Sequence, residues 1–72
     1  MNPFITIHGQ NLTVEVNRTE PYRNLCALGN TIYCLNKVVL AKFDTPERTF
    51  EVWQQLKKAA LEGADSFTIP KE

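Results

Sequence analysis

The chain has no net charge and no long apolar stretch, and each absence argues against a class of function. Its 72 residues carry eight basic and eight acidic side chains, so the formal net charge is zero. A nonspecific nucleic-acid-binding protein needs a concentrated positive surface, whereas the basic residues here are scattered along the chain. No apolar run approaches the roughly 18 residues of a membrane span. We therefore expect neither a nucleic acid nor a membrane as partner.

Motifs of catalysis and metal binding are also missing. The three glycines are too dispersed for a phosphate-binding loop, and neither HExxH nor GxSxG occurs. The single histidine, His8, and the two separated cysteines lack the spacing of a metal site. The sequence therefore predicts no catalytic residue, no metal ligand and no cofactor, and we expect the protein not to be an enzyme.

The two cysteines, Cys26 and Cys34, are too far apart for a CxxC redox motif. They fall on adjacent predicted strands around a turn at residues 29–30, so they could face each other, and their pairing stays open. In a reducing compartment they would act as small buried apolar residues. A thiol-dependent enzyme is the less favoured alternative, because it needs an orienting base and a pocket. Residues 1–4 show no charged leader, and we expect a cytoplasmic protein.

Length and composition indicate one small domain spanning residues 1–72. Hydrophobic residues make up 43% of the chain and charged residues 22%, which is typical of an ordinary globular protein. A core of this size often supplies only about 3–5 kcal/mol of stability. A homo-oligomer is therefore expected, because burying a shared face would add stability.

The strand pattern is clearest near the N-terminus. Residues 4–8 are mostly apolar or β-branched, and residues 12–17 alternate apolar and polar side chains, which is typical of half-buried antiparallel strands. Further strands are predicted over residues 22–27, 31–35 and 38–43, although residues 24–28 could instead form a helical turn. The path of residues 18–30 is the least determined. Because residues 38–41 are apolar on both faces, we expect that strand to be central in its sheet.

One amphipathic helix is predicted between a threonine cap and a glycine stop. Thr45 suits the N-cap, Pro46 the first helical position, and Gly63 the left-handed end. The helical period places five residues on one buried stripe: Thr49, Val52, Trp53, Leu56 and Ala60. The predicted fold is α+β: an antiparallel sheet of four to five strands, one helix packed across it, and a short extended segment at the C-terminus.

Residues 38–70 resemble small, largely uncharacterised proteins of bacterial mobile elements and phages. The likeness rests on a strand that ends in Phe43, the Asp44-Thr45-Pro46-Glu47 entry to the helix, and the tail over residues 67–70. These positions are caps, turns and core, so the resemblance transfers no functional residue. It implies a small accessory protein. Phe50 departs from the family pattern, because that position is usually polar there, and this suggests a surface covered by another chain.

Aromatic and arginine side chains supply the candidate binding residues, since both types are enriched at interaction hot spots. We predict an interface formed by Phe50, Trp53 and Leu61. The leading hypothesis is a non-enzymatic protein that binds and blocks a host protein. The alternative is an oligomeric sponge that sequesters a nucleotide-type signal in a counter-defence role. The ligand-binding residues predicted for this alternative are Tyr22, Arg23 and Arg48.

Overall fold

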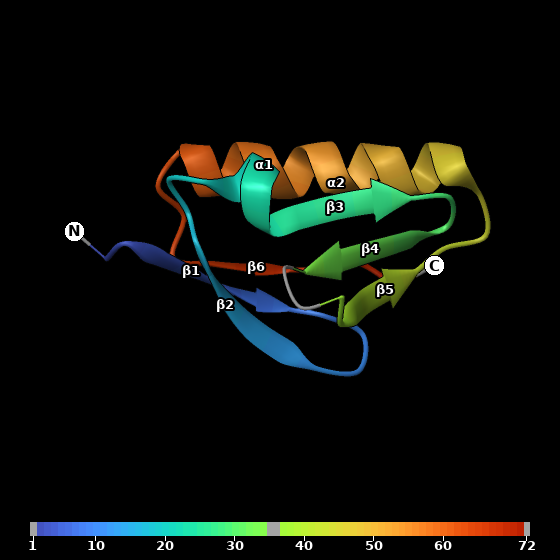
Figure 1. Ribbon diagram of the computed structural model, residues 1–72, viewed down its shortest axis with the longest axis horizontal. Coiled ribbons are helices and arrows are strands. Elements are labelled where there is room, and N and C mark those ends of the chain that lie inside the picture. Colours follow the sequence, from blue (N-terminus) through green and yellow to red (C-terminus); the bar gives the residue numbers. More distant parts are fainter. Residues whose placement is uncertain (1, 35–36, 72) are drawn as a thin grey trace.

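Two three-stranded sheets and a long helix build the protein, as the computed structural model shows for residues 2–34 and 37–71 (Figure 1). The first sheet has the strand order β2-β1-β6 and the second has the order β3-β4-β5. In chain order the elements are β1 (Phe4–His8), β2 (Thr13–Asn17), α1 (Pro21–Asn24), β3 (Leu25–Leu28), β4 (Thr31–Cys34), β5 (Val39–Lys42), α2 (Pro46–Leu61) and β6 (Ser66–Thr68).

The α+β class is confirmed, but the prediction of one sheet of four to five antiparallel strands is wrong. The C-terminal segment becomes β6, which pairs with β1 in parallel, with Thr6 opposite Ser66 and His8 opposite Thr68. Strand β1 therefore has neighbours on both sides, and β5 does not join it in a ladder. Hydrophobic alternation locates strands along a chain. It does not tell which distant strands pair.

Strand β5 was predicted to be central, and this is also wrong, because it lies at the edge of the second sheet. Its apolar run is nevertheless covered, with Leu40 and Ala41 both buried. The turn after β1 packs on this edge: the backbone N–H of Gln10 donates to the Leu40 carbonyl at 3.0 Å. The turn that contacts this edge belongs to the same chain.

The segment predicted as a strand over residues 22–27 is divided in two. Pro21 begins a single helical turn, α1, in which the Leu25 N–H donates to the Pro21 carbonyl. Proline suits this position because its missing N–H would be unpaired there and its φ is already helical. Strand β3 follows at Leu25 and returns through the left-handed Gly29 into β4. The turn predicted at residues 29–30 is confirmed, whereas the last residue of the strand predicted over residues 31–35 falls outside the described residues.

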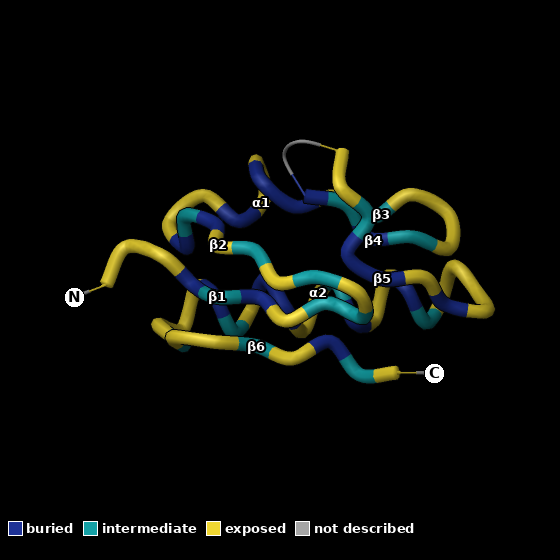
Figure 2. Tube along the Cα trace, turned by 90° about the horizontal axis from the view of Figure 1, so that it is seen from below, coloured by how far each residue is buried: buried dark blue, intermediate teal, exposed yellow. Residues whose placement is uncertain are grey.

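Helix α2 is capped as its sequence predicts. The Thr45 hydroxyl accepts the Arg48 backbone N–H at 3.2 Å, Pro46 occupies the first turn, and Gly63 has a positive φ of 91°. Four of the five predicted stripe residues are buried, and Trp53 is half-buried. The core lies between α2 and the two sheets, with fully buried Ile5, Ile7, Leu25, Ile32, Leu40, Val52 and Leu56. Figure 2 shows the turns of the chain as mostly exposed.

Candidate functional site

The candidate site is an exposed surface beside the buried stripe of α2. We call it the aromatic flank, and it consists of Tyr22 of α1 with Phe50, Trp53, Lys57 and Leu61 of α2. Helical residues three and four positions apart lie on the same side, which aligns the four α2 members. Tyr22 is 64% exposed, Phe50 50% and Leu61 54%. Three large side chains thus offer apolar surface to solvent on one side of the molecule.

Trp53 anchors the aromatic flank to the sheet. Its indole N–H donates to the backbone carbonyl of Leu25 at 3.3 Å, on the edge strand β3. Its ring is 5.6 Å from the Phe50 ring, centroid to centroid, with the planes tilted by 40°. This spacing lies in the favourable range for aromatic pairs. Trp53 therefore both joins the core and holds Phe50 in place.

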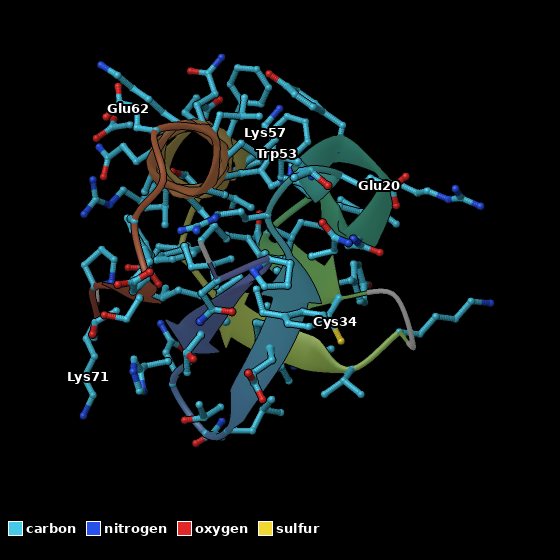
Figure 3. All side chains as sticks on the ribbon, turned by 90° about the vertical axis from the view of Figure 1, so that its left-hand side faces the viewer. Glu20, Cys34, Trp53, Lys57, Glu62 and Lys71 are labelled. Atoms are coloured by element: carbon cyan, nitrogen blue, oxygen red, sulfur yellow. The ribbon has the colours of Figure 1, made fainter. Side chains whose placement is uncertain are left out.

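Lys57 lies between two aromatic rings. Its Nζ is 3.1 Å from the centroid of the Trp53 ring and 4.1 Å from that of Tyr22. Figure 3 shows Lys57 and Trp53 in the space between α2 and α1. The residue is only 7% exposed, and desolvation by burial lowers the pKa of its amine from the ordinary 10.5. The negative faces of the rings attract the ammonium and oppose that shift.

The sequence analysis did not single out Lys57 as a site residue. Trp53 precedes it by one helical turn, and an aromatic residue at that spacing is a local signal for such a contact. The contact with Tyr22 is tertiary, because α1 and α2 are distant in sequence. The ammonium held between two rings is thus the part of the aromatic flank that the sequence alone did not reveal.

A shallow hollow of about 400 Å³ opens beside Lys57. It is lined by Tyr22, Gln54, Lys57, Lys58, Leu61 and Glu62. Lys58 and Glu62 form an exposed ion pair at 4.0 Å. With two lysines against one glutamate, the hollow carries a surplus positive charge. It is suited to an anionic group held next to an apolar one.

The three residues of the predicted nucleotide site do not meet within one chain. Tyr22 lines the hollow beside Lys57, whereas Arg23 lines a different hollow over β3 and β4. Arg48 forms a 2.7 Å ion pair with Glu51, and the helical period places it on the opposite side of α2 from Phe50. Tyr22 alone therefore belongs to the aromatic flank, and a role for all three in one site remains a prediction that needs a second subunit.

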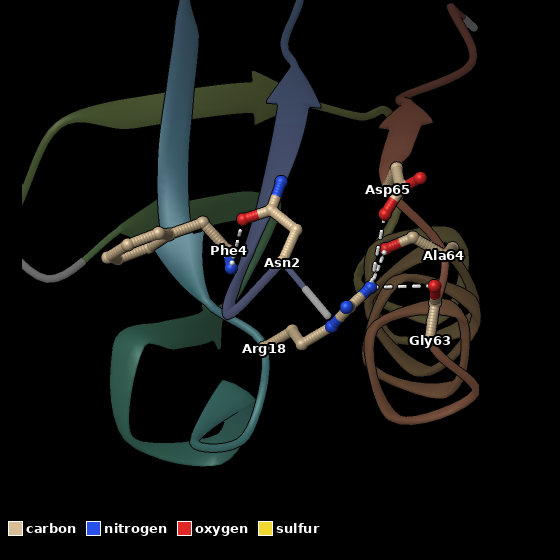
Figure 4. Close-up of polar contacts among 6 residues, drawn as sticks. All are labelled: Asn2, Phe4, Arg18, Gly63, Ala64 and Asp65. Carbon is tan, nitrogen blue, oxygen red and sulfur yellow. Dashed lines mark hydrogen bonds and ion pairs between the residues drawn. The ribbon is translucent and has the colours of Figure 1, made fainter.

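Arg18 is buried and caps the end of α2 (Figure 4). One guanidinium nitrogen, Nη1, donates to the carbonyls of Gly63 at 2.6 Å and Ala64 at 3.0 Å. The same nitrogen lies 3.3 Å from a carboxylate oxygen of Asp65. Both carbonyls belong to the turn that follows α2, just past its C-cap residue Glu62, and the guanidinium gives them a hydrogen-bond donor. This arginine is structural.

The two cysteines do not face each other, and in the structure both are free thiols. Cys26 is paired in register with Tyr33, while Cys34 is paired with Leu25. Successive residues of a strand point to opposite faces, so Cys26 is exposed and Cys34 is buried. The expectation of two buried cysteines therefore holds for Cys34 only.

A second hollow, of about 540 Å³, lies over β3 and β4. Its lining residues are Arg23, Cys26, Ala27, Leu28, Tyr33, Cys34 and Lys37. His8 does not line this hollow: it lies at the end of β1, in the other sheet, with its Nδ1 3.4 Å from the Thr13 hydroxyl. Among residues 2–34 and 37–71, no three His, Cys, Asp or Glu side chains gather as a metal site would require.

Comparisons of this chain with protein-family models, with curated proteins and with solved structures find no match. The resemblance of residues 38–70 to mobile-element proteins therefore remains a prediction. In the described part of the chain, no helix has both the length and the apolar character needed to cross a membrane.

Proposed function

We propose that this protein is a small non-enzymatic binding protein that engages another protein through the aromatic flank. The observation that carries the proposal is the exposure of Phe50, Leu61 and Tyr22 around the anchored Trp53. Contiguous apolar surface on a small protein marks an interaction site, and tryptophan and tyrosine are frequent hot-spot residues. The rings are already held in position, so little side-chain entropy is lost when a partner binds.

The partner we propose is a host protein, which the chain would block as an accessory factor of a phage or mobile element. A helix side that presents aromatic and aliphatic residues one turn apart fits an apolar groove on another protein. The same surface can also join two copies of the chain. Exposed Phe50 favours such a homo-oligomer.

The test is site-specific photo-crosslinking in bacterial extract. A photoreactive phenylalanine analogue at position 50 should form an adduct with one defined protein, or with a second copy of the chain. The matched control carries the analogue at Gln55, which is exposed on another side of α2. Excess unlabelled wild-type protein should suppress the adduct, and the Phe50→Glu variant should not. Equal labelling from both positions, or no competition by wild-type protein, would contradict the proposal.

Light scattering distinguishes the two kinds of partner. If copies of the chain associate through the aromatic flank, Phe50→Glu should shift the oligomer toward monomer and leave the fold intact. A wild-type protein that is monomeric at high concentration would rule out self-association. The crosslinked adduct would then have to contain a different protein.

A nucleotide sponge is the second candidate, and it is favoured by Tyr22 beside a hollow that also contains Lys57 and Lys58. An aromatic ring next to cations suits a base and its phosphate. A nucleotide present at a hundred times its dissociation constant should stabilise the protein by roughly 2.7 kcal/mol. Thermal unfolding with a panel of nucleotides measures this effect. No shift with any member would retire the sponge.

A further inference from the structure

Lys57 combines a buried side chain with a charge that no described carboxylate neutralises. Its ammonium forms no hydrogen bond or ion pair with residues 2–34 or 37–71, and its contacts there are the two ring faces. Within those residues, no fully buried side-chain nitrogen or oxygen lacks a hydrogen-bond partner. The Nζ atom therefore keeps some contact with water, and Lys57 is one of the residues that line the hollow beside α2.

A protein that covers the aromatic flank would remove this last water from Nζ. Burying an uncompensated ammonium is costly, because its hydration is lost and nothing replaces it. Ring faces recover only part of that loss. A partner that binds through this surface therefore has to bring its own acceptor to Lys57, and a carboxylate compensates the charge where a neutral carbonyl does not.

We infer that the partner segment presents an aspartate or glutamate side chain to Lys57, flanked by apolar side chains that cover Phe50 and Leu61. This inference rests on the proposed function, since it names the chemistry of the partner at that same surface. Charge complementarity supports it, because the hollow holds two lysines and one glutamate. The negative charge of Glu62 is shared with Lys58 at its distance of 4.0 Å, which leaves Lys57 as the uncompensated cation.

A random twelve-residue peptide library displayed on phage tests the inference without knowledge of the natural partner. Peptides are selected on wild-type protein, and those that also bind the Phe50→Ala variant, which removes the ring without adding a charge, are discarded. The remaining peptides should be enriched in Asp or Glu next to large apolar residues. A parallel selection on Lys57→Met, which keeps an apolar stem against Trp53 and removes the charge, should yield no acidic enrichment.

Affinities of matched synthetic peptides make the test quantitative. The best peptide and its variant with Gln in place of Glu should differ by about tenfold in Kd on wild-type protein, as expected for one charge-assisted hydrogen bond. On Lys57→Met the two peptides should bind equally. Circular dichroism of the variant checks that its fold is retained, and the peptide pair on wild-type protein is informative even if that variant fails to fold.

The outcomes separate the inference from the function on which it rests. Peptides that depend on Phe50 but show no acidic preference would overturn the inference and leave a binding function standing. A failure to select any peptide sensitive to Phe50→Ala would contradict the proposed function and the inference together. Acidic peptides that bind Lys57→Met as well as wild type would place the carboxylate elsewhere and would also overturn it.

Discussion

The buried Arg18 gives the sharpest stability prediction. Replacing it with methionine keeps an apolar stem but removes the donor that Gly63 and Ala64 share at the end of α2 (Figure 4). Hydrogen bonds from a charged group contribute roughly 1.5–3 kcal/mol each. These two are not independent, because they use one nitrogen, and Gly63 is exposed enough for water to replace part of the loss. We expect Arg18→Met to lower the free energy of unfolding by about 2–3 kcal/mol.

That loss is large for a chain of this size, whose total stability is on the order of 4–11 kcal/mol. Urea unfolding monitored by Trp53 fluorescence measures it. Hydrogen exchange adds the location: the N–H groups of Glu62, Gly63 and Ala64 bond back into the last turn of α2. Their exchange should accelerate in the variant more than that of amides near the start of α2.

Asp65→Asn is the matched control. It removes the ion pair with Arg18 but leaves both carbonyl contacts in place, and the Asp65 side chain is 80% exposed. An ion pair with so exposed a carboxylate contributes little, so we expect a loss below about 1 kcal/mol. The capping argument would be refuted if Arg18→Met cost no more than the control, or if its faster exchange were spread evenly over α2.

Three further predictions follow from single positions. Gly9→Ala should lower the free energy of unfolding by about 1–3 kcal/mol, because the added Cβ would lie 2.6 Å from the Leu40 carbonyl oxygen. Urea titration measures this loss, and an unchanged unfolding midpoint would contradict it. Cys26 should react with a thiol reagent in the native protein, whereas the buried Cys34 should react only after unfolding. Mass spectrometry of the labelled protein measures both, and equal labelling rates would contradict the placement of the two cysteines on opposite faces of the sheet. Desolvation lowers the pKa of Lys57 in the folded state only. Between that lowered pKa and 10.5 the unfolded chain binds more protons than the folded one, so the free energy of unfolding should rise with pH. This rise should vanish in Lys57→Met, and its persistence there would show that Lys57 is not its source.

Local signals in the sequence were sufficient to locate α2, the strands β1 and β2, and the turn between β3 and β4. A capping threonine, a proline in the first turn and a terminal glycine act within a few residues of the helix ends. Alternating side chains mark β1 and β2, and tight turns join strands that are neighbours in the chain. The prediction of a strand over residues 22–27 failed at its first residues, because Pro21 begins a helical turn there.

The candidate site was only partly accessible from the sequence. The period of α2 brought Phe50, Trp53 and Leu61 to the same side of the helix, and the structure shows that Phe50 and Leu61 are exposed there. The helical period could not show that Tyr22 lies against Lys57, or that Arg23 lines another hollow. These contacts depend on how α1 packs against α2, which no local pattern encodes.

The sequence by itself determined where most of the helix and strand segments lie, because caps, turns and side-chain periods act over a few neighbouring residues. Only the tertiary structure decided that β6 pairs with β1, that Arg18 ends buried against the last turn of α2, and that Lys57 is enclosed by two rings. The physical reason is the same in each case. Strand partners and the burial of a charge depend on residues far apart in the chain, and their energies exist only once the core has brought those residues together.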